Sequence, residues 1–483
     1  MQHSVTERLA THVATLDALS LPVAVVARAQ DCLLDSIGCM LGGSGIAEVR
    51  DTVEFVLRPG DASEAAVPGL AGLYPTPLAA HAGAQFANAL DYDDTVLGVG
   101  HPGAGIVATA LAIGQAKDSS GTELLRALIA GYETTVRVGR GMEPSEERAS
   151  TVRGHTWAVL GPTAVASALM NLTKDQIVNA FGFAAQHALV PYVGKWYERP
   201  ITPLKANYGW AALGGVLSAS MAAEGFKTNR QIFDGENGFW RMASSDQWDP
   251  GRALAGIGSE YVILDVEFKP FAACRYTHSA LDALEQIIER HAPDVSAIRS
   301  VVIRAGNRIK LFTDYEPRTL LDAQFSLPFA SASLLLGRPL TSFDPSDREL
   351  AELAHRVQLE ADPDLEPKSR LSRLPTHVEI ELQSGERLSE HSEVALGDPK
   401  RPIGPERLRQ KFFDLAIPVL GADRSEQLVG RVNGLLELRS TRELADLFAV
   451  RETVQDKTSC SDVSRGAGPS RGPGQCQRTG VHQ

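Results

Sequence analysis

Cysteine patterns that bind metals or form disulfides are missing from this 483-residue chain. It has five cysteines, and no two of them form a C-x-x-C pair or a zinc-finger spacing. Cys32, Cys39 and Cys274 stand in apolar surroundings, whereas Cys460 and Cys476 stand in a polar C-terminal segment. This usage fits a reducing environment, and we expect no structural metal.

A basic surface and a long apolar run are also missing. The chain has 59 acidic and 47 basic residues, a formal charge of -12, which disfavours nucleic acid or an anionic membrane as its main partner. No segment reaches membrane-spanning length without charged or many small polar residues. The first thirty residues mix Glu7, Arg8 and Asp17 into a helical pattern, unlike a signal peptide. We therefore expect a cytoplasmic protein that binds neither nucleic acid nor membrane.

Motifs of common nucleotide and hydrolase sites are absent as well. The sequence contains no Walker loop and no G-x-S-x-G nucleophile motif. Residues 98–103 match G-x-G-x-x-G, but they follow an acidic stretch in a helical context rather than a strand. A dinucleotide fingerprint is therefore disfavoured.

The first half of the chain has the apolar periodicity of helices. Apolar residues recur at three- and four-residue spacing from Val5 to about Gly258, and the length of the whole chain favours two domains. Helices are predicted at residues 24–40, 124–140 and 173–189 and, rich in Ala, Gly and Ser, at 103–116, 158–170 and 209–223. Small side chains let helices approach closely, so we expect the last three helices to lie inside a bundle.

The pattern changes after Glu267. Strands are predicted at residues 298–305, 377–382 and 387–394, the last two as a hairpin, with amphipathic helices at 280–291, 323–336 and 347–357. Helical patterning returns at residues 405–450. The predicted fold is therefore mainly α with an inserted α+β domain. Its parts are a helical domain at residues 1–267, a lid with a small antiparallel sheet at 268–401, the rest of the helical domain at 402–452, and a tail at 453–483 whose composition predicts disorder.

Titratable side chains stand at the starts of the three small-residue helices. His101, His155 and Lys205 each precede one of them. A helix N-terminus attracts anions. If these starts meet at one end of the bundle, two imidazoles and an ammonium surround a pocket that suits a substrate with two or three carboxylates. The alternative for each residue taken alone is a cap or a hydrogen-bonded core group.

An acidic stretch just before His101 adds to this pattern. Histidine suits proton transfer near neutral pH, and a cationic dry pocket stabilises the charge left when a C–H beside a carboxylate is deprotonated. Asp91 or Asp93, with Thr95, would orient an imidazole or bind a substrate hydroxyl. One alternative is a capping cluster that includes Asp93 and Asp94. The other is a metal site, which is disfavoured because H-x-x-x-H and similar ligand spacings are missing.

From about Val5 to Val450 the chain resembles the MmgE/PrpD family, which includes 2-methylcitrate dehydratase, cis-aconitate decarboxylase and iminodisuccinate epimerase. The matching motifs are LDSIG at residues 34–38, ANALDYDDT at 87–95 with His101-Pro102, GYE at 131–133, Gly154-His155 with Gly161, FKP at 268–270, CRYTH at 274–278 and AQFSLP at 323–328. The resemblance implies a helical domain with an inserted lid, and a homodimer.

The resemblance also implies a set of site residues. We predict His101, His155 and Asp91 as catalytic residues and Thr95, Lys205, Lys269, Arg275, Cys274 and His278 as substrate-binding residues. Lys205 departs from the family pattern, because its spacing before the small-residue helix is shifted by one residue. Cys274 also departs, since it stands where some members have a pocket histidine, and His278 follows four residues later.

The leading hypothesis is a cofactor-independent lyase, without a metal, that dehydrates or decarboxylates a citrate- or aconitate-like polycarboxylate. An epimerase or isomerase of a dicarboxylate such as iminodisuccinate is the alternative, because it needs the same carbanion stabilisation but returns the proton to the other face. A catalytically silent scaffold is a third reading, which the retained Asp91, Thr95, His101 and His155 disfavour. Lid side chains near residues 269–278 and 315–318 are expected to determine the substrate.

Overall fold

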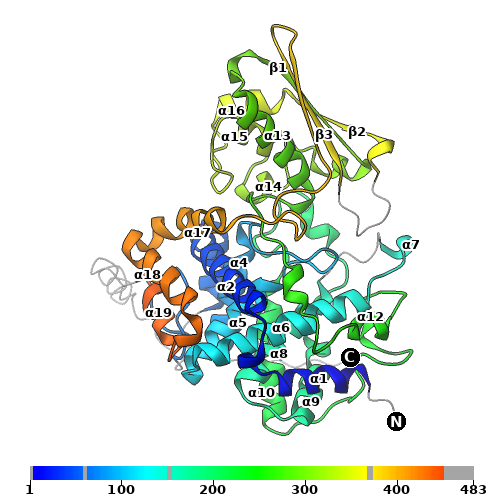
Figure 1. Ribbon diagram of the computed structural model, residues 1–483, viewed down its shortest axis with the longest axis vertical. Coiled ribbons are helices and arrows are strands. Elements are labelled where there is room, and N and C mark those ends of the chain that lie inside the picture. The colour runs from blue at the N-terminus through cyan, green and yellow to red at the C-terminus, as the bar shows by residue number, and fades with distance from the viewer. Residues whose placement is uncertain (1–3, 58–62, 150–154, 367–373, 451–483) are drawn as a thin grey trace, which may run out of the picture. The chain divides into compact units, whose positions relative to one another are not determined.

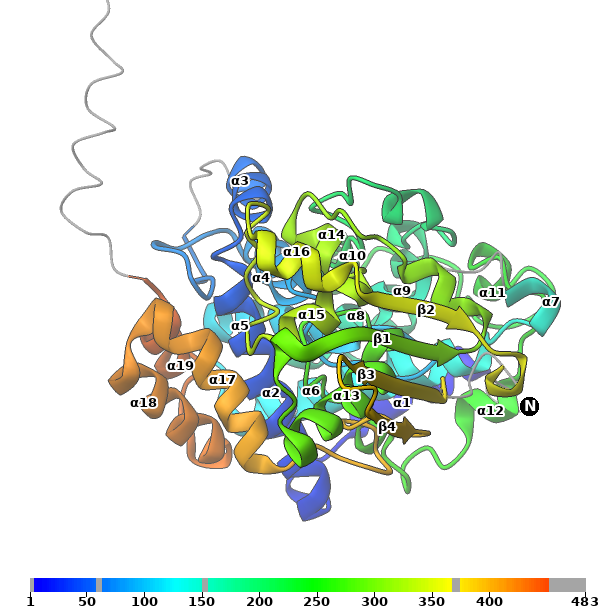
Figure 2. The same ribbon diagram turned by 90° about the horizontal axis from the view of Figure 1, so that it is seen from above.

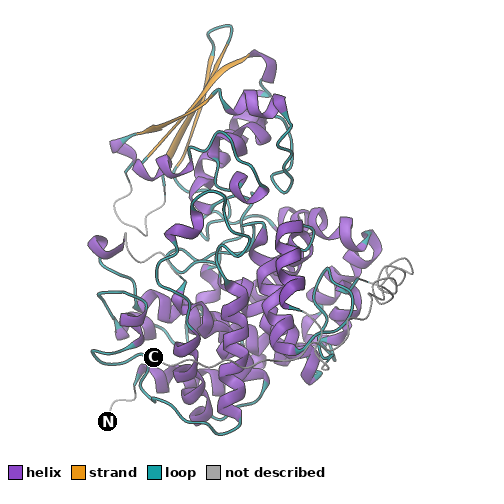
Figure 3. Cartoon of the chain, turned by 180° about the vertical axis from the view of Figure 1, so that it is seen from behind, coloured by secondary structure: helices purple, strands orange, loops and turns teal. Residues whose placement is uncertain are grey.

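Helices dominate the computed structural model of this chain, which describes residues 4–57, 63–149, 155–366 and 374–450. Figure 1 shows these helices together with one small sheet, and Figure 3 shows that the strands gather in a single place. The mainly helical fold with a small strand region is therefore confirmed. The predicted disordered tail at residues 453–483 lies outside the described residues.

The first part of the chain contributes twelve α-helices to the described structure. They are α1 (Val5–Thr15), α2 (Val23–Gly43), α3 (Ala47–Val56), α4 (Thr76–Ala89), α5 (Pro102–Lys117), α6 (Gly121–Gly141), α7 (Glu146–Ala149), α8 (Leu160–Leu169), α9 (Lys174–Ala184), α10 (Tyr208–Ala223), α11 (Phe239–Met242) and α12 (Pro250–Leu254). Several helix boundaries differ from prediction by one to five residues. The first turn of the helix expected at 158–170 is a 3₁₀ turn, η2 (Thr156–Val159), and the helix expected to reach residue 189 ends at Ala184.

The three small-residue helices α5, α8 and α10 pack against one another, with α4 and α6 beside them. Glycine makes this close packing possible. A Cβ at Gly215 of α10 would lie 2.5 Å from the Cβ of Pro162, and one at Gly161 would lie 2.7 Å from a side-chain carbon of Ile106. The prediction that these helices are interior is confirmed for α5 and α8, in which nearly every residue is buried, whereas α10 also has the exposed side chains Trp210 and Leu217.

A four-stranded sheet with helices beside it forms the second part. Its elements are α13 (His278–His291), β1 (Ile298–Ala305), α14 (Leu320–Ala323), α15 (Leu327–Leu335), α16 (Arg348–Ala354), β2 (Val357–Ala361), β3 (Thr376–Leu382) and β4 (Arg387–Ser392). The strand order is β2-β1-β3-β4, and β3 and β4 form the predicted hairpin. Figure 2 shows α15 and α16 along the β1 and β2 side of this sheet.

The expectation of an antiparallel sheet is wrong, because the sheet is mixed. Strand β2 runs parallel to β1, with Val301 opposite Val357, whereas β3 runs antiparallel to β1, with Ile303 opposite Val378. A parallel neighbour needs a long crossover, and α14 to α16 supply it between the two strands. Strand β2 was missed, since the helix expected at 347–357 ends at Ala354.

Buried apolar side chains form two separate clusters. One joins residues between Val5 and Phe268 to residues between Ile403 and Phe448, and the other lies between Phe271 and Leu388. The first cluster includes the C-terminal helices α17 (Pro405–Leu420), α18 (Ala422–Asn433) and α19 (Arg442–Phe448), of which α17 packs against α2. The domain boundaries at residues 267, 401 and 452 stay predictions.

No single helix among the described residues is both long and apolar enough to cross a membrane. The pair α2 and α3, bent by 97°, passes the length and composition criteria when its two helices are taken together. Most residues of α2 from Cys32 to Leu41 are buried in the first apolar cluster.

Candidate active site

The starts of the three small-residue helices meet, as the sequence predicted. His101 precedes α5, His155 precedes η2, and Tyr208 is the first residue of α10. The ring centroids of His101 and His155 lie 6.5 Å apart, and the Tyr208 ring lies 6.0 Å from His101 and 5.2 Å from His155. The backbone N–H of His101 donates to the Tyr208 hydroxyl at 2.9 Å. A Cβ at Gly100 would lie 2.5 Å from Nδ1 of His155, so glycine is required there.

Asp91 lies at the centre of the cluster of charged groups. It follows the end of α4 with a φ of 48°, a left-handed conformation that is uncommon outside glycine. Nζ of Lys269 donates to its Oδ1 at 2.9 Å and also to its backbone oxygen. Nζ of Lys205 lies 3.9 Å from Oδ2, and Nε2 of His101 lies 3.4 Å from Oδ1. One buried carboxylate therefore faces two ammonium groups and an imidazole.

These contacts set the charge of Asp91. Burial by itself would raise its pKa, but Lys205, Lys269 and His101 outweigh burial and hold the pKa well below its ordinary value. For Lys205, burial lowers the pKa, and Lys269 adds to that effect while Asp91 opposes it. The carboxylate is therefore ionised at neutral pH and serves as the counter-ion of the two lysines.

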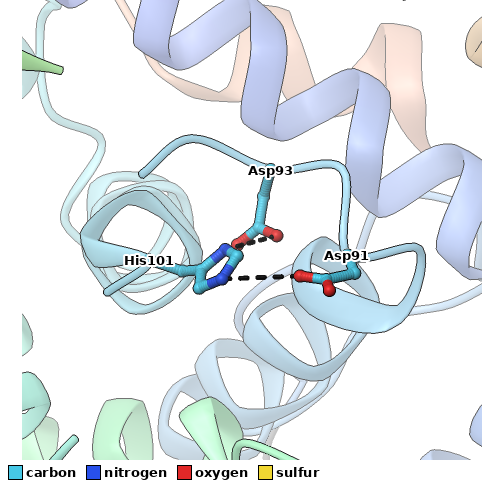
Figure 4. Close-up of side chains that lie close together, drawn as sticks. All are labelled: Asp91, Asp93 and His101. Atoms are coloured by element: carbon cyan, nitrogen blue, oxygen red, sulfur yellow. Dashed lines mark hydrogen bonds and ion pairs between the residues drawn. The ribbon is translucent and has the colours of Figure 1, made fainter. Parts of the chain in front are cut away.

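Asp93 contacts the other side of the His101 ring. Its Oδ1 lies 3.0 Å from Nδ1 of His101, and the side-chain amide of Asn88 donates to the same carboxylate at 3.0 Å. Figure 4 shows the imidazole between Asp93 and Asp91. The contact with Asp93 favours the tautomer of His101 that carries its proton on Nδ1, because an ionised carboxylate only accepts hydrogen bonds.

Asp94 serves as the helix cap. Its carboxylate accepts from the backbone N–H of Gly103 at 2.9 Å and from the Tyr132 hydroxyl at 2.5 Å. A Cβ at Gly103 would lie 2.6 Å from this carboxylate, which explains the glycine there. Burial, with Asp93 and Asp35 adding to it, raises the pKa of Asp94 to about 7. Capping is therefore confirmed for Asp94, whereas Asp93 instead contacts His101.

Thr95 lies where the acidic stretch pairs with the segment that precedes Lys269. Its backbone pairs with that of Glu267 through two hydrogen bonds of 2.9 and 2.8 Å. Its buried hydroxyl has no hydrogen-bond partner among the described residues. A buried hydroxyl in this state is available to a bound ligand.

A glutamine of the lid, Gln324, holds Lys205 in the cluster. Its side-chain oxygen accepts from Nζ of Lys205 at 2.7 Å, and its amide donates to the backbone oxygen of Ala89 at 3.0 Å. The Phe325 ring lies under the same ammonium, 5.1 Å from Nζ to the centroid. Lys205 therefore reaches Asp91 in spite of its shifted spacing in the sequence.

The remaining predicted lid residues make other contacts. The backbone N–H of Cys274 donates to the backbone oxygen of Gln324 at 2.9 Å, and burial, followed by the charge of Asp91, raises its pKa to about 12, so the thiol is neutral. Nε of Arg275 donates to Glu267 at 2.7 Å. Burial, reinforced by Arg275 and Lys269, lowers the pKa of His278.

The side chains of His278 and Arg275 make different contacts from that of Lys269. The His278 ring lies against Phe271, and its Nε2 is 3.1 Å from the backbone oxygen of Ala273. Within the described residues, neither side chain forms a hydrogen bond or ion pair with residues 91–101. Substrate binding by these two residues stays a prediction.

Comparison with known families identifies the chain. It matches the MmgE/PrpD N-terminal domain over residues 7–250 and the MmgE/PrpD C-terminal domain over residues 271–433. The chain belongs to the MmgE/PrpD family. The resemblance stated from the motifs is thereby confirmed.

Curated relatives of this MmgE/PrpD chain are similar along nearly their whole length. Human cis-aconitate decarboxylase is 27% identical over 488 residues, covering 96% of this chain and 98% of the human protein. The mouse cis-aconitate decarboxylase is 28% identical, covering 95% and 96%. The cis-aconitate decarboxylase of Aspergillus terreus is 24% identical over 473 residues, covering 91% and 94%. The chain is thus a distant relative of cis-aconitate decarboxylases.

The metal alternative can be weighed against this geometry. Asp91, Asp93 and His101 each offer one ligand atom, and these atoms lie within 4.8 Å of one another. The Lys269 ammonium, however, contacts the same Asp91 oxygen at 2.9 Å, and a second ammonium, that of Lys205, lies nearby. Two buried positive charges repel a cation, so the arrangement favours a network of ion pairs. The absence of a metal stays a prediction.

Two residues that this MmgE/PrpD chain places in the cluster were not among the predicted site residues. The Tyr208 ring lies beside both histidine rings, and Gln324 holds Lys205. Both stand in segments that the sequence had marked, Tyr208 at a small-residue helix start and Gln324 in the AQFSLP motif. Their contacts depend on tertiary packing, which those local signals do not contain.

Proposed function

We propose that this MmgE/PrpD protein is a cofactor-independent lyase that removes carbon dioxide or water from a citrate- or aconitate-like polycarboxylate. The observation that carries the proposal is the placement of His101 between two carboxylates, beside two buried ammonium groups. The curated relatives named cis-aconitate decarboxylase, which align along nearly the whole chain, support the substrate class.

Substrate binding would use the two lysines. In the absence of substrate, Asp91 balances Lys205 and Lys269. The second carboxylate of a substrate would bring negative charge to a site that holds two ammonium groups, an imidazole and the buried hydroxyl of Thr95. Buried charges interact strongly because little water screens them, so a polycarboxylate is favoured over a monocarboxylate.

The proton transfers would use the two histidines. In a decarboxylation, the bond to one carboxylate breaks, carbon dioxide leaves, and the electron pair stays on the substrate until an imidazole donates a proton. In a dehydration, one imidazole removes a C–H proton while another group protonates the departing hydroxyl. His101 and His155, with ring centroids 6.5 Å apart, supply two separate proton sites for such steps. Asp93 would keep Nδ1 of His101 protonated throughout.

One assay tests the proposal. The purified protein is incubated in deuterated water with citrate, 2-methylcitrate, cis-aconitate and iminodisuccinate in turn, and proton spectra are recorded. We expect loss of carbon dioxide or water from a tricarboxylate, with deuterium incorporated at one carbon when carbon dioxide leaves. Deuterium uptake into recovered iminodisuccinate, without loss of either molecule, would instead indicate the epimerase. No change in any substrate would contradict the proposal.

A further inference from the structure

Lys411, on the C-terminal helix α17, is a buried lysine that the proposed chemistry does not use. Its side chain is 3% exposed. Nζ lies 2.5 Å from Oδ1 of Asp35, donates to the backbone oxygen of Tyr92 at 2.7 Å, and lies 4.0 Å from the centroid of the Tyr92 ring. Burying an ammonium is costly unless its contacts compensate. These three contacts all involve α2 or the acidic stretch that leads to His101.

Tyr92 is the residue between the two carboxylates that flank His101. Asp91 and Asp93 are its direct neighbours in the chain, and Asp91 has a left-handed backbone conformation. On the far side of the ring, the Tyr92 hydroxyl donates to the backbone oxygen of Pro270 at 3.1 Å, next to Lys269. Tyr92 is therefore held at two points. Lys411 of α17 binds its backbone oxygen, and Pro270 accepts a hydrogen bond from its hydroxyl.

A lysine that only neutralised Asp35 would not need the Tyr92 carbonyl. The contact with the Tyr92 carbonyl fixes the peptide unit between Tyr92 and Asp93. A shift of this peptide unit would move the carboxylate of Asp93 relative to that of Asp91. We infer that Lys411 is a positioning residue, which holds the Tyr92 carbonyl so that Asp91 and Asp93 stay on opposite ring nitrogens of His101. The inference deepens the proposed function, on which its consequence for catalysis rests.

The test compares Lys411→Met with Arg409→Met. Both changes remove one positive charge from α17, but Arg409 is half exposed and pairs with Glu426 on the surface. The protein is labelled with ¹³C at the histidine Cε1, and His101 is titrated without substrate, its signal assigned by its absence in His101→Ala. The groups around the ring, Asp91, Asp93, Lys205, Lys269, His155 and Tyr208, stay unchanged in both variants.

We expect Lys411→Met to shift the titration midpoint of His101 by at least half a pH unit, while Arg409→Met leaves it unchanged. On a substrate that the panel identifies, Lys411→Met should lower kcat about tenfold or more with KM changed less than about threefold, because substrate-binding groups remain. A folded Lys411→Met protein with the native His101 titration would overturn the inference.

Two further variants keep the test decisive if Lys411→Met does not fold. Asp35→Asn combined with Lys411→Met removes both buried charges and still lacks the donor to Tyr92, so we expect a folded protein with the same shift of His101. Lys411→Arg keeps a charged donor and should restore part of the native titration. A native His101 titration in the double variant would overturn the positioning role.

Failure of the inference differs from failure of the proposed function. The titration needs no substrate, so a shifted His101 in Lys411→Met supports the positioning role even if no acid in the panel reacts. Turnover of a tricarboxylate together with an unshifted His101 would leave the lyase proposal standing and reject the role of Lys411.

Discussion

The acidic stretch Asp91–His101 and the lid segment Lys269–His278 contribute to the cluster very unequally. In the stretch, the side chains of Asp91 and Asp93 both contact His101 (Figure 4). Among the described contacts of the lid segment, the side chain of Lys269 is the one that pairs with this stretch, through Asp91. Arg275 pairs with Glu267, and His278 is buried against Phe271.

This difference follows from the local backbone. The stretch joins the end of α4 to the start of α5, so two helix termini and a left-handed residue fix where its side chains point. The lid segment leads into α13, and its residues Phe271 and Ala273 belong to the second apolar cluster. We infer that proton handling belongs to the helical part and that the lid supplies a charge to bind the substrate.

Of the variants in the two regions, His101→Ala should reduce turnover most. A positioned acid or base contributes about 10²–10⁴-fold, and His101 lies between both carboxylates, so we expect turnover to fall by about a thousandfold. Steady-state assays on the reacting acid measure this. His391→Ala, an exposed histidine of β4, is the matched control and should keep normal turnover. Near-normal activity in His101→Ala would reject its assignment.

Lys269→Met tests whether the lid supplies charge. The change leaves the buried Asp91 with Lys205 at 3.9 Å as its remaining lysine partner, and breaking a buried pair costs about 3–5 kcal/mol. We also expect about a hundredfold loss of turnover. Urea unfolding and kinetics check both. Asp91→Asn combined with Lys269→Met should recover stability without activity, and a single variant as stable as the native protein would contradict the expectation.

Asp93→Asn probes the orientation of His101. The amide still accepts from Nδ1 but no longer stabilises a charged imidazole, so we expect about a tenfold loss of turnover and a lower titration midpoint for His101. Asp94→Asn is the matched control, because it changes the neighbouring carboxylate, which caps α5. Equal activity of the two variants would show that Asp93 has no special role.

Much of the fold was readable from periodicity. The helices α5 and α10 begin within one residue of prediction, and the β3–β4 hairpin lies where alternation placed it. Strand β2 was missed because only His355 and Arg356 separate it from α16, with no glycine or proline to mark the break. The helix expected at 323–336 begins only at Leu327, since α14 ends at Ala323 and Ser326 caps α15, with Pro328 in its first turn.

The site was readable only where its signals were local. The titratable residues at helix starts are visible in single segments, and so His101 and Asp91 were found. Tyr208, Gln324 and Lys411 were not, because their contacts join residues 107, 119 and 319 positions apart in the chain. Such contacts depend on how whole helices pack, and no short pattern contains that information.

Asp94 in the acidic stretch and His278 in the lid segment should change the free energy of unfolding with pH in opposite directions. The pKa of Asp94 is about 7 against an ordinary value of 3.8, so between these pH values the carboxyl is protonated in the folded state and ionised in the unfolded state. The free energy of unfolding therefore falls as pH rises from about 4 to 7. The lowered pKa of His278 weakens folding as pH falls below 6.5, because only the unfolded state is protonated.

Asp94→Asn should therefore reduce the stability lost between pH 5 and pH 8 by about 2.5 kcal/mol, since pH 5 lies two units below the pKa of about 7 and one unit corresponds to about 1.4 kcal/mol. His278→Gln should flatten the response below pH 6.5 instead. Urea midpoints measured across the pH range separate the two. An unchanged pH slope in Asp94→Asn would contradict the raised pKa.

Arg275→Met tests whether a second residue of the lid segment binds the substrate, and we expect it to have the smallest effect on catalysis. The motif predicts that Arg275 binds a substrate carboxylate, whereas the structure pairs it with the buried Glu267, whose backbone holds Thr95. If the pair is structural, the variant loses about 1–3 kcal/mol of stability while KM changes less than about twofold. Lys269→Met, in which the lid's ammonium is lost, supplies the contrasting KM. A tenfold rise in KM for Arg275→Met with unchanged stability would return Arg275 to the binding site, and the lid would then contribute more than one charge.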